Sequence, residues 1–199
     1  EIHHLIIEVY EKQLALKDAE LNFLQSQLNP HFVFNVLNAI GLQAKMDGNQ
    51  KLSQTISTFS KYMQAKMKQD DTGKVRVRQE LEYVKCYLEI QQFRYGETLS
   101  FEIEVEEKVL ESYIQKFCIQ LIVENAILHG IGPKMGKGRI RIRGYERKEK
   151  ILIEIEDDGI GISKERLWQV NDGIQKKILT GKDIYGLYNV NERIRLNFG

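Results

Sequence analysis

The stretch that says most about this chain is residues 25–40, which read Gln25-Ser26-Gln27-Leu28-Asn29-Pro30-His31-Phe32-Val33-Phe34-Asn35-Val36-Leu37-Asn38-Ala39-Ile40. Its pattern is that of a long helix, yet a proline stands directly before a histidine. A proline inside a helix removes one backbone hydrogen bond and crowds the preceding turn, at a cost of about 3 kcal/mol. A helix that keeps this costly residue next to an imidazole predicts that His31 has a function.

The chemistry open to His31 follows from its side chain. A neutral imidazole has a lone pair on one ring nitrogen, and that lone pair can attack a phosphorus atom. On an exposed helix surface, the resulting phosphohistidine would be accessible to a second protein domain. The alternative is a histidine that only packs against its neighbours or is solvated.

The residues around this stretch predict a helical hairpin over residues 1–70. Apolar residues recur every seven positions at Ile7, Leu14, Leu21 and Leu28, which indicates a short coiled coil. The residues Asp47-Gly48-Asn49 interrupt the helix, and residues 51–68 form a second one. Because the apolar faces of two helices are too small for a core, we expect a homodimer that completes a four-helix bundle.

The pattern changes after a linker at residues 70–73, and we expect a second domain over residues 71–199. Helical periodicity at 79–94, 115–129 and 186–198 alternates with strand-like periodicity at 101–105, 139–145 and 151–156. This order predicts an α+β fold in which helices cover one side of a sheet.

The segment 120–130, QLIVENAILHG, is the second candidate for chemistry. We expect Leu121, Ile122, Ala126 and Leu128 to face the sheet, and Glu124, Asn125 and His129 to cluster on the other side of the helix. An amide oxygen is a suitable ligand for Mg²⁺, which keeps much of its shell for water and phosphate. A core helix with a polar outer face is the alternative.

Two glycine-containing segments follow. In residues 151–162 a strand runs into an acidic turn with Asp157, Gly159 and Gly161, where a carboxylate can accept a hydrogen bond from an amine and glycine lets the backbone approach a flat ring. A plain turn is the alternative, and the alternating oxygen ligands of a calcium loop are missing. In residues 185–194 we expect Gly186 to open a helix and present N–H groups to phosphate. The polar stretch 170–182 before it fits a lid or a surface loop.

These segments together resemble the LytS/YesM-type sensor histidine kinases. Residues 29–35, Asn-Pro-His-Phe-Val-Phe-Asn, resemble the phosphoacceptor box, and the segments at 120–130, 157–161 and 186 onward resemble the ATP-binding fold of gyrase, Hsp90, histidine kinases and MutL. The chain departs from that pattern in having Ile184 for a first glycine and Gln115 for a proline. It also ends at Gly199, where the family continues into a final pair of strands.

The resemblance implies roles for particular residues. His31 would be the phosphoacceptor, Asn125 would hold Mg²⁺, and Glu124 and His129 would lie near the phosphates of ATP. The adenine site would include Asp157, Gly159 and Gly161, and the nucleotide contacts would extend to Gly186, Leu187 and Asn189. Many relatives place an acid directly after the histidine, and here that position is Phe32. Glu124 is then the candidate to orient His31 or take its proton, and Asn35 to position water or the phosphoryl group.

The resemblance also implies an activity and partners. The chain would transfer the γ-phosphoryl group of ATP to His31 and then to an aspartate in a response-regulator receiver domain. It would be the cytoplasmic part of a bacterial sensor that is anchored in the membrane upstream of Glu1. A net charge of +1 gives no reason to expect a nucleic-acid partner. An ATP hydrolase or serine kinase of the same fold, and a dimeric signalling scaffold without catalysis, remain as alternatives.

Overall fold

The computed structural model describes residues 30–67, 73–176 and 182–198. The predicted heptads at residues 7–28 lie outside these ranges. The described residues group into two compact units that meet between Ser60 and Lys61. The last two turns of the second helix therefore belong to the second unit, and the domain boundary expected near residue 70 stays a prediction.

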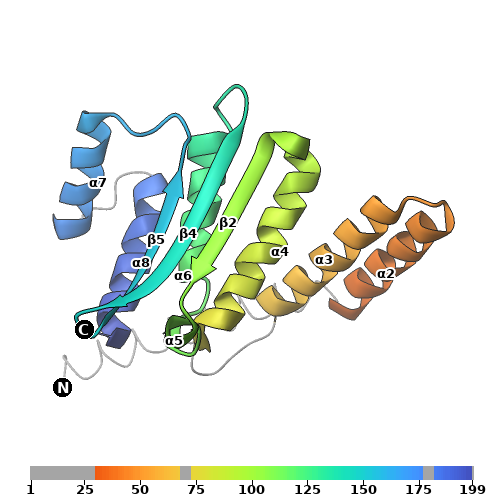
Figure 1. Ribbon diagram of the computed structural model, residues 1–199, viewed down its shortest axis with the longest axis horizontal. Helices are drawn as coiled ribbons and strands as arrows, with labels where there is room; N and C mark the ends of the chain where they lie inside the picture. The colour runs from red at the N-terminus through yellow and green to blue at the C-terminus, as the bar shows by residue number, and fades with distance from the viewer. Residues whose placement is uncertain (1–29, 68–72, 177–181, 199) are drawn as a thin grey trace, which may run out of the picture. The chain divides into compact units, whose positions relative to one another are not determined.

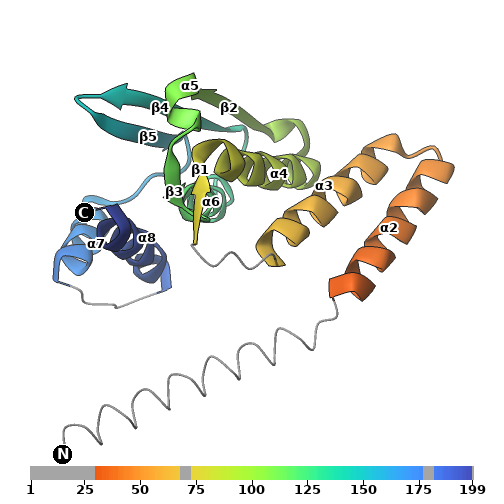
Figure 2. The same cartoon turned by 90° about the horizontal axis from the view of Figure 1, so that it is seen from below.

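The first unit is built on the predicted helical hairpin. Helix α2 (Pro30–Met46) and helix α3 (Gln50–Met67) are antiparallel, as Figures 1 and 2 show for α2 and the first part of α3. The turn between them needs Gly48, whose φ is +75°, a value that side chains disfavour. The predicted turn is confirmed, and Asn49 also caps α3 by accepting the N–H of Leu52 at 3.1 Å.

Helix α2 divides its apolar residues between two faces. Val33, Leu37 and Ala44 are buried or half-buried on the face that contains Gly41, where an added Cβ would lie 3.4 Å from Ile56 of α3. A second stripe, Phe32, Val36 and Ile40, is between 40% and 65% exposed. The hairpin therefore leaves an apolar stripe on its surface.

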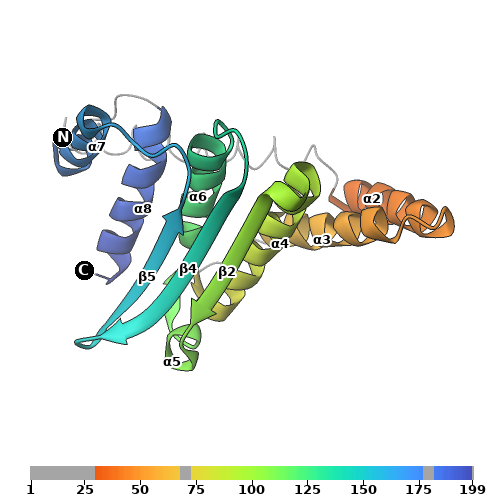
Figure 3. The ribbon, with the colours of Figure 1, turned by 45° about the horizontal axis from the view of Figure 1, so that its top comes forward.

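The second unit contains a three-stranded sheet in the order β2-β4-β5. Strand β2 (Leu99–Val105) runs parallel to β4 (Gly138–Arg147), and β4 runs antiparallel to β5 (Lys150–Asp157). Figure 3 shows helices α4 (Val77–Tyr95), α6 (Cys118–Asn125) and α8 (Lys182–Phe198) behind one face of this sheet. The α+β class, with helices on one side, is confirmed.

The alternation of the strands explains the two faces. Ile140 and Ile142 of β4 are fully buried against the helices, whereas Arg141 and Arg143 between them point to the opposite face. There, Arg141 pairs with Glu102 on β2 at 3.0 Å, and Arg143 pairs across the sheet with β5. Solvated ion pairs of this kind contribute little to stability, so the buried face holds the sheet in place.

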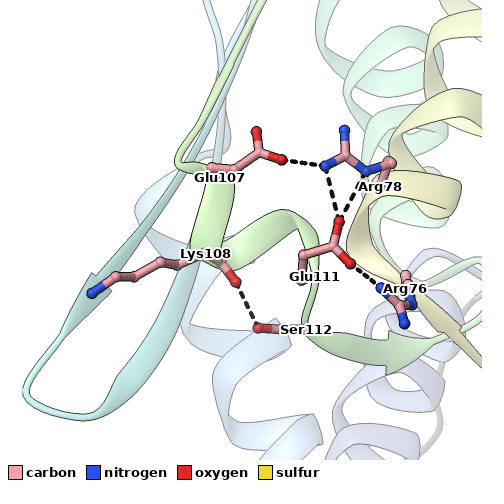
Figure 4. Close-up of polar contacts among 6 residues, drawn as sticks. All are labelled: Arg76, Arg78, Glu107, Lys108, Glu111 and Ser112. Carbon is pink, nitrogen blue, oxygen red and sulfur yellow. Dashed lines mark hydrogen bonds and ion pairs between the residues drawn. The ribbon is translucent and has the colours of Figure 1, made fainter.

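Four short elements between residues 74 and 115 were not predicted from the sequence. Strand β1 (Lys74–Arg76) pairs with β3 (Tyr113–Gln115), while η1 (Gly96–Thr98) and α5 (Glu107–Leu110) flank β2. Figure 4 shows how Arg76 and Arg78 hold the end of α5 through Glu111, with a further pair from Arg78 to Glu107. Ser112 donates to the carbonyl of Lys108 at 3.2 Å and closes the turn.

The helix predicted over residues 115–129 differs from the observed one at both ends. Gln115 belongs to β3 and pairs with Lys74 of β1, and Phe117 has a φ of +66°, so α6 begins only at Cys118. From Ala126 to Ile131 the chain continues as a π-helix, η2. Of the residues predicted to face the sheet, Ala126 is buried in the core, but Leu128 is 62% exposed, which is a correction. The large apolar side chains that this segment buries are Ile119, Val123 and Ile127.

Glu80 fixes the beginning of α6. It is a fully buried residue of α4 whose carboxylate accepts the backbone N–H groups of Phe117, Ile119 and Gln120 at 2.8, 3.1 and 3.3 Å. The first N–H groups of a helix have no partner within it, so a buried acceptor is needed here. Burial raises the pKa of Glu80, while the three N–H groups oppose that shift.

Within the described ranges, no helix combines the length and apolar character needed to span a bilayer.

We expect Glu80→Ala to lower the free energy of unfolding by about 2–4 kcal/mol, because it leaves buried N–H groups without an acceptor. Urea unfolding followed by circular dichroism measures the change. Glu82→Ala is the matched control, since Glu82 is an exposed residue of the same helix, and it should stay within about 0.5 kcal/mol of the parent. Equal losses in both variants would show that Glu80 does not anchor α6.

Candidate functional site

A cavity of about 480 Å³ lies in the second unit, where α6 and η2 meet the end of β5. This volume is within the usual range for small-ligand sites. Of the residues singled out from the sequence, the structure brings five to its wall: Asn125, His129, Asp157, Gly161 and Leu187. The wall is completed by residues that the sequence analysis did not name for this site, which are Ile122, Ala126, Gly130, Ile155, Ile162, Ser163, Arg166 and Val170.

The floor of the cavity is one face of the α6–η2 helix. Ile122, Asn125, Ala126 and His129 follow one another at spacings of three, one and three residues, which places them on one side of a helix. The π-turn is visible in the bond from the Gly132 N–H to the carbonyl of Ile127, at 2.7 Å. Turns of this kind are rare in proteins as a whole but are often found at functional sites, and this one brings the backbone of residue 130 to the cavity wall.

Gly130 and Gly159 form a close backbone contact beside the cavity. A Cβ on Gly159 would lie 2.3 Å from the carbonyl carbon of Gly130, and a Cβ on Gly130 would lie 2.5 Å from Oδ1 of Asp157. The N–H of Ile160 also donates to the Gly130 carbonyl at 3.0 Å. Gly159 therefore acts by close packing and does not itself line the cavity, whereas Gly161 does, with a φ of +72°.

The two adjacent acids, Asp157 and Asp158, have different surroundings. Oδ1 of Asp157 accepts the Gly159 N–H at 2.9 Å, and the side chain contributes to the cavity wall. Oδ1 of Asp158 accepts the N–H of Arg139 at 2.7 Å and pairs with Lys134 at 3.1 Å. The Arg139 N–H and Lys134 together lower the pKa of Asp158. Asp157 is thus the acid that a ligand in the cavity can contact.

Helix α7 (Lys164–Lys176) forms another side of the cavity and was not predicted. Ser163 caps it by accepting the Arg166 N–H at 3.1 Å, and Arg166 and Val170 lie one turn apart on the cavity side. Residues 170–176 of the stretch interpreted as a lid or loop are therefore helical, and Gly173 is buried. The signal in the sequence was the serine cap followed by apolar residues at 167, 170 and 174.

Helix α8 closes the cavity through Leu187. It begins at Lys182, so the prediction that Gly186 opens the helix is wrong. The Gly186 amide lies beyond the N–H groups that a helix start leaves without partners. A Cβ at Gly186 would lie 3.7 Å from Nδ2 of Asn125, which places this part of α8 against the Asn125 side chain. Asn189 is half-buried and does not line the cavity.

Glu124 is another predicted site residue that does not line the cavity. It precedes Asn125 but faces away from the cavity, and its Oε1 accepts hydrogen bonds from Gln120 at 2.6 Å and Tyr62 at 3.1 Å. Lys66 adds an ion pair at 3.4 Å. The expected cluster of Glu124, Asn125 and His129 is therefore divided between two faces of α6.

His31 and Asn35 belong to the first unit. Both are exposed on α2 and lie one turn apart, and Nδ2 of Asn35 is 3.2 Å from Nδ1 of His31. When that N–H donates, the proton of the neutral ring lies on Nε2. If the amide turns over, its oxygen accepts a proton on Nδ1, and the Nε2 lone pair is left free. The orientation of the amide thus decides whether the Nε2 lone pair is free to act as a nucleophile.

The comparisons with known proteins match two families along this chain, and the first match extends across the boundary between the two units. Residues 19–99 match the histidine kinase family, and residues 116–199 match the family of histidine kinase-, DNA gyrase B-, and HSP90-like ATPases. The second match covers the helices and strands that build the cavity, and this part of the second unit has the fold of that ATPase family.

Two relatives identified by sequence narrow the class. The sensor histidine kinase YesM of Bacillus subtilis is 34% identical over all of this chain, and the sensor protein LytS of Bacillus cereus is 31% identical over 97% of it. A histidine kinase domain from a blue-light activated kinase of Erythrobacter litoralis covers 91% of this chain and is itself 84% covered, at 13% identity and a TM-score of 0.44. The chain belongs to the LytS/YesM-type sensor histidine kinases. It spans about a third of the length of YesM and LytS, at 32% and 33%.

Proposed function

We propose that this chain is the kinase core of a two-component sensor, which transfers the γ-phosphoryl group of ATP to His31. The observation that carries the proposal is the cavity that joins Asp157 and Asn125 in one unit, while the other unit presents an exposed imidazole on a helix. An acceptor side chain on a separate unit suits a reaction in which a protein is the substrate.

The cavity wall supports a bound nucleotide in a definite orientation. Asp157 would accept a hydrogen bond from the exocyclic amine of adenine. Its carboxylate lies at the cavity wall beside the close contact of Gly130 and Gly159, where a Cβ on either glycine would clash. Asn125 and His129 would then lie toward the phosphates, and Arg166 supplies positive charge at the wall.

The polar groups on this wall suit a Mg²⁺ ion that binds together with the nucleotide. The described residues contain no group of three or more His, Cys, Asp or Glu side chains that could hold a metal by themselves. The Asn125 amide oxygen would be the protein ligand, and phosphate oxygens and water would complete the shell, as Mg²⁺ prefers. When bound, the ion neutralises part of the phosphate charge.

His31 performs the chemical step. The lone pair of one ring nitrogen attacks the γ-phosphorus, the bond from that phosphorus to the bridging oxygen breaks, and ADP leaves with the electron pair. The proton on the other ring nitrogen is then lost, which leaves a neutral imidazole ring that carries the anionic phosphoryl group. Asn35 would hold the ring in the reactive tautomer, and Glu124 would take the proton. Positioning and charge neutralisation carry most catalysis of this kind.

The same proposal includes partners. Phosphohistidine would pass its phosphoryl group to an aspartate of a response-regulator receiver domain. A second copy of the chain would cover the stripe of Phe32, Val36 and Ile40, because exposed apolar stripes of this kind mark association sites. The whole protein would be a bacterial sensor anchored in a membrane, with this chain on the cytoplasmic side.

The homodimer can be tested through that stripe. Light scattering at micromolar concentration should give the mass of two chains for the parent and of one chain for Val36→Asp, which places a charge on the stripe. Asn38→Asp adds the same charge at an exposed polar position and should remain dimeric. A monomeric parent would contradict the proposed dimer.

The phosphoacceptor can be tested with γ-labelled ATP. The parent should acquire an acid-labile label, and His31→Gln should acquire none while its ATP affinity stays within about twofold, because the substitution lies outside the cavity. Acid-stable label would instead indicate a serine kinase. Free phosphate without protein label would indicate a hydrolase, and ATP binding without either product would indicate a scaffold.

The two nucleotide contacts should respond differently to substitution. Asp157→Asn places a donor toward the adenine amine, and the loss of about 1–3 kcal/mol should weaken ATP binding roughly 5- to 150-fold with or without Mg²⁺. Asp158→Asn is the matched control and should bind within about threefold of the parent. Asn125→Ala should remove the difference between titrations in Mg²⁺ and in EDTA. If Asp157→Asn binds like the parent, the adenine contact lies elsewhere.

A further inference from the structure

The end of helix α3 makes a polar contact with α6 that the proposed chemistry does not use. Tyr62 and Lys66, one turn apart on α3, both reach Glu124, at 3.1 Å and 3.4 Å. Gln120, one turn before Glu124 on α6, donates to the same carboxylate and also to the Tyr62 hydroxyl. We call these four residues, Tyr62, Lys66, Gln120 and Glu124, the α3 latch. All four belong to the second unit.

Aromatic rings pack around Tyr62 and Lys66 of the α3 latch. The Tyr62 ring is 8% exposed and lies 6.1 Å from the ring of Tyr87, while the Lys66 ammonium is 5.2 Å from the Tyr62 ring and 5.9 Å from that of Phe117. Burial raises the pKa of Tyr62, so its hydroxyl stays a neutral donor at physiological pH. Burial alone would lower the pKa of Lys66, but Tyr62 and Glu124 raise it overall.

The latched arrangement also has a cost. Gln120 is 1% exposed, and its Oε1 is buried without a hydrogen-bond partner in the described part of the chain. If the Gln120 amide turned over, Nε2 would face the position that Oε1 now occupies, and the two hydrogen bonds that Nε2 donates would be lost. A buried polar atom without a partner is unfavourable, so this conformation competes with others in which the amide is satisfied.

The latch occupies the side chain that the proposed reaction needs. Glu124 was assigned as the acceptor of the His31 proton, yet its carboxylate is engaged by three donors and faces away from the cavity. We propose that Tyr62 and Lys66 are positioning residues that act through Glu124 to hold the kinase in a restrained state. Phosphorylation of His31 then requires that Glu124 leave the α3 latch. This inference rests on the proposed kinase function.

The test measures phosphorylation and nucleotide binding separately. Tyr62→Phe removes only the hydroxyl and keeps the ring packing, and Lys66→Met removes the charge and keeps most of the stem. Tyr62→Phe should raise the initial rate of acid-labile labelling at saturating ATP by about 10- to 100-fold, because a hydrogen bond to a charged group is lost from the restrained state. Lys66→Met should raise it by about two- to fivefold, because a partly exposed ion pair is lost. The KM for ATP and the ATP Kd should stay within about twofold, because neither residue lines the cavity.

Matched controls exist within the chain. Tyr145 donates its hydroxyl to Glu154 at 2.6 Å on the exposed face of the sheet, so Tyr145→Phe breaks a tyrosine–glutamate bond elsewhere. Lys61→Met removes a charge from an exposed position of α3. Both controls should label at the parental rate. A variant that is merely destabilised would lose activity, and only release of a restraint raises it.

Hydrogen exchange provides a second measurement that needs no activity. The amides of residues 61–67 should exchange faster in Tyr62→Phe and Lys66→Met than in the parent and the two controls. Unchanged or reduced labelling rates in both variants, or unchanged exchange, would overturn the latch. A parent that binds ATP but never labels would overturn the proposed function instead, and exchange would still decide whether Tyr62 and Lys66 hold α3 to α6.

Discussion

The hydrogen bonds from three backbone N–H groups to the buried carboxylate of Glu80 fix the start of α6, and the rest of the site depends on that position. A helix that starts one residue earlier or later would rotate every side chain by about 100°. Asn125 would then leave the cavity wall, and Glu124 would leave the α3 latch. The left-handed φ of Phe117 shows how sharply the chain turns to bring these N–H groups to Glu80.

Helix α6 contacts three different parts of the structure. Ile119 and Val123 are buried in the core between the sheet and α4, Ile122 and Asn125 face the cavity, and Gln120 and Glu124 face the end of α3. This explains why the segment has almost no residue on a plainly solvated face. It also explains why only part of it was predictable: a helical wheel distinguishes apolar from polar residues, but it cannot tell a polar residue beside a ligand from one beside another helix.

The sequence predicted the features that depend on local pattern. The turn at Gly48, the strands of the sheet and the meeting of Asn125, His129 and Asp157 follow from spacing and from the resemblance of the motifs. The three-residue strands β1 and β3 are too short to show a period, and the start of α8 precedes the glycine that was expected to open it. The contacts of Glu124 with α3 could not be predicted, because Tyr62 lies 62 residues and Lys66 58 residues away in the chain.

The carboxylate of Glu80, which anchors α6, and that of Glu124, which belongs to α6, differ in how firmly they are held, and this difference suits their roles. Glu80 is fully buried with three donors, so breaking its contacts would expose several unpaired groups together. The Glu124–Lys66 pair is 29% and 40% exposed, and such pairs contribute only about 0–1 kcal/mol after solvent screening. The Tyr62 hydroxyl adds about 1.5–3 kcal/mol as a donor to a charged group. A contact of a few kcal/mol can be opened by binding or conformational energy, whereas the Glu80 anchor stays in place while α6 changes its partner.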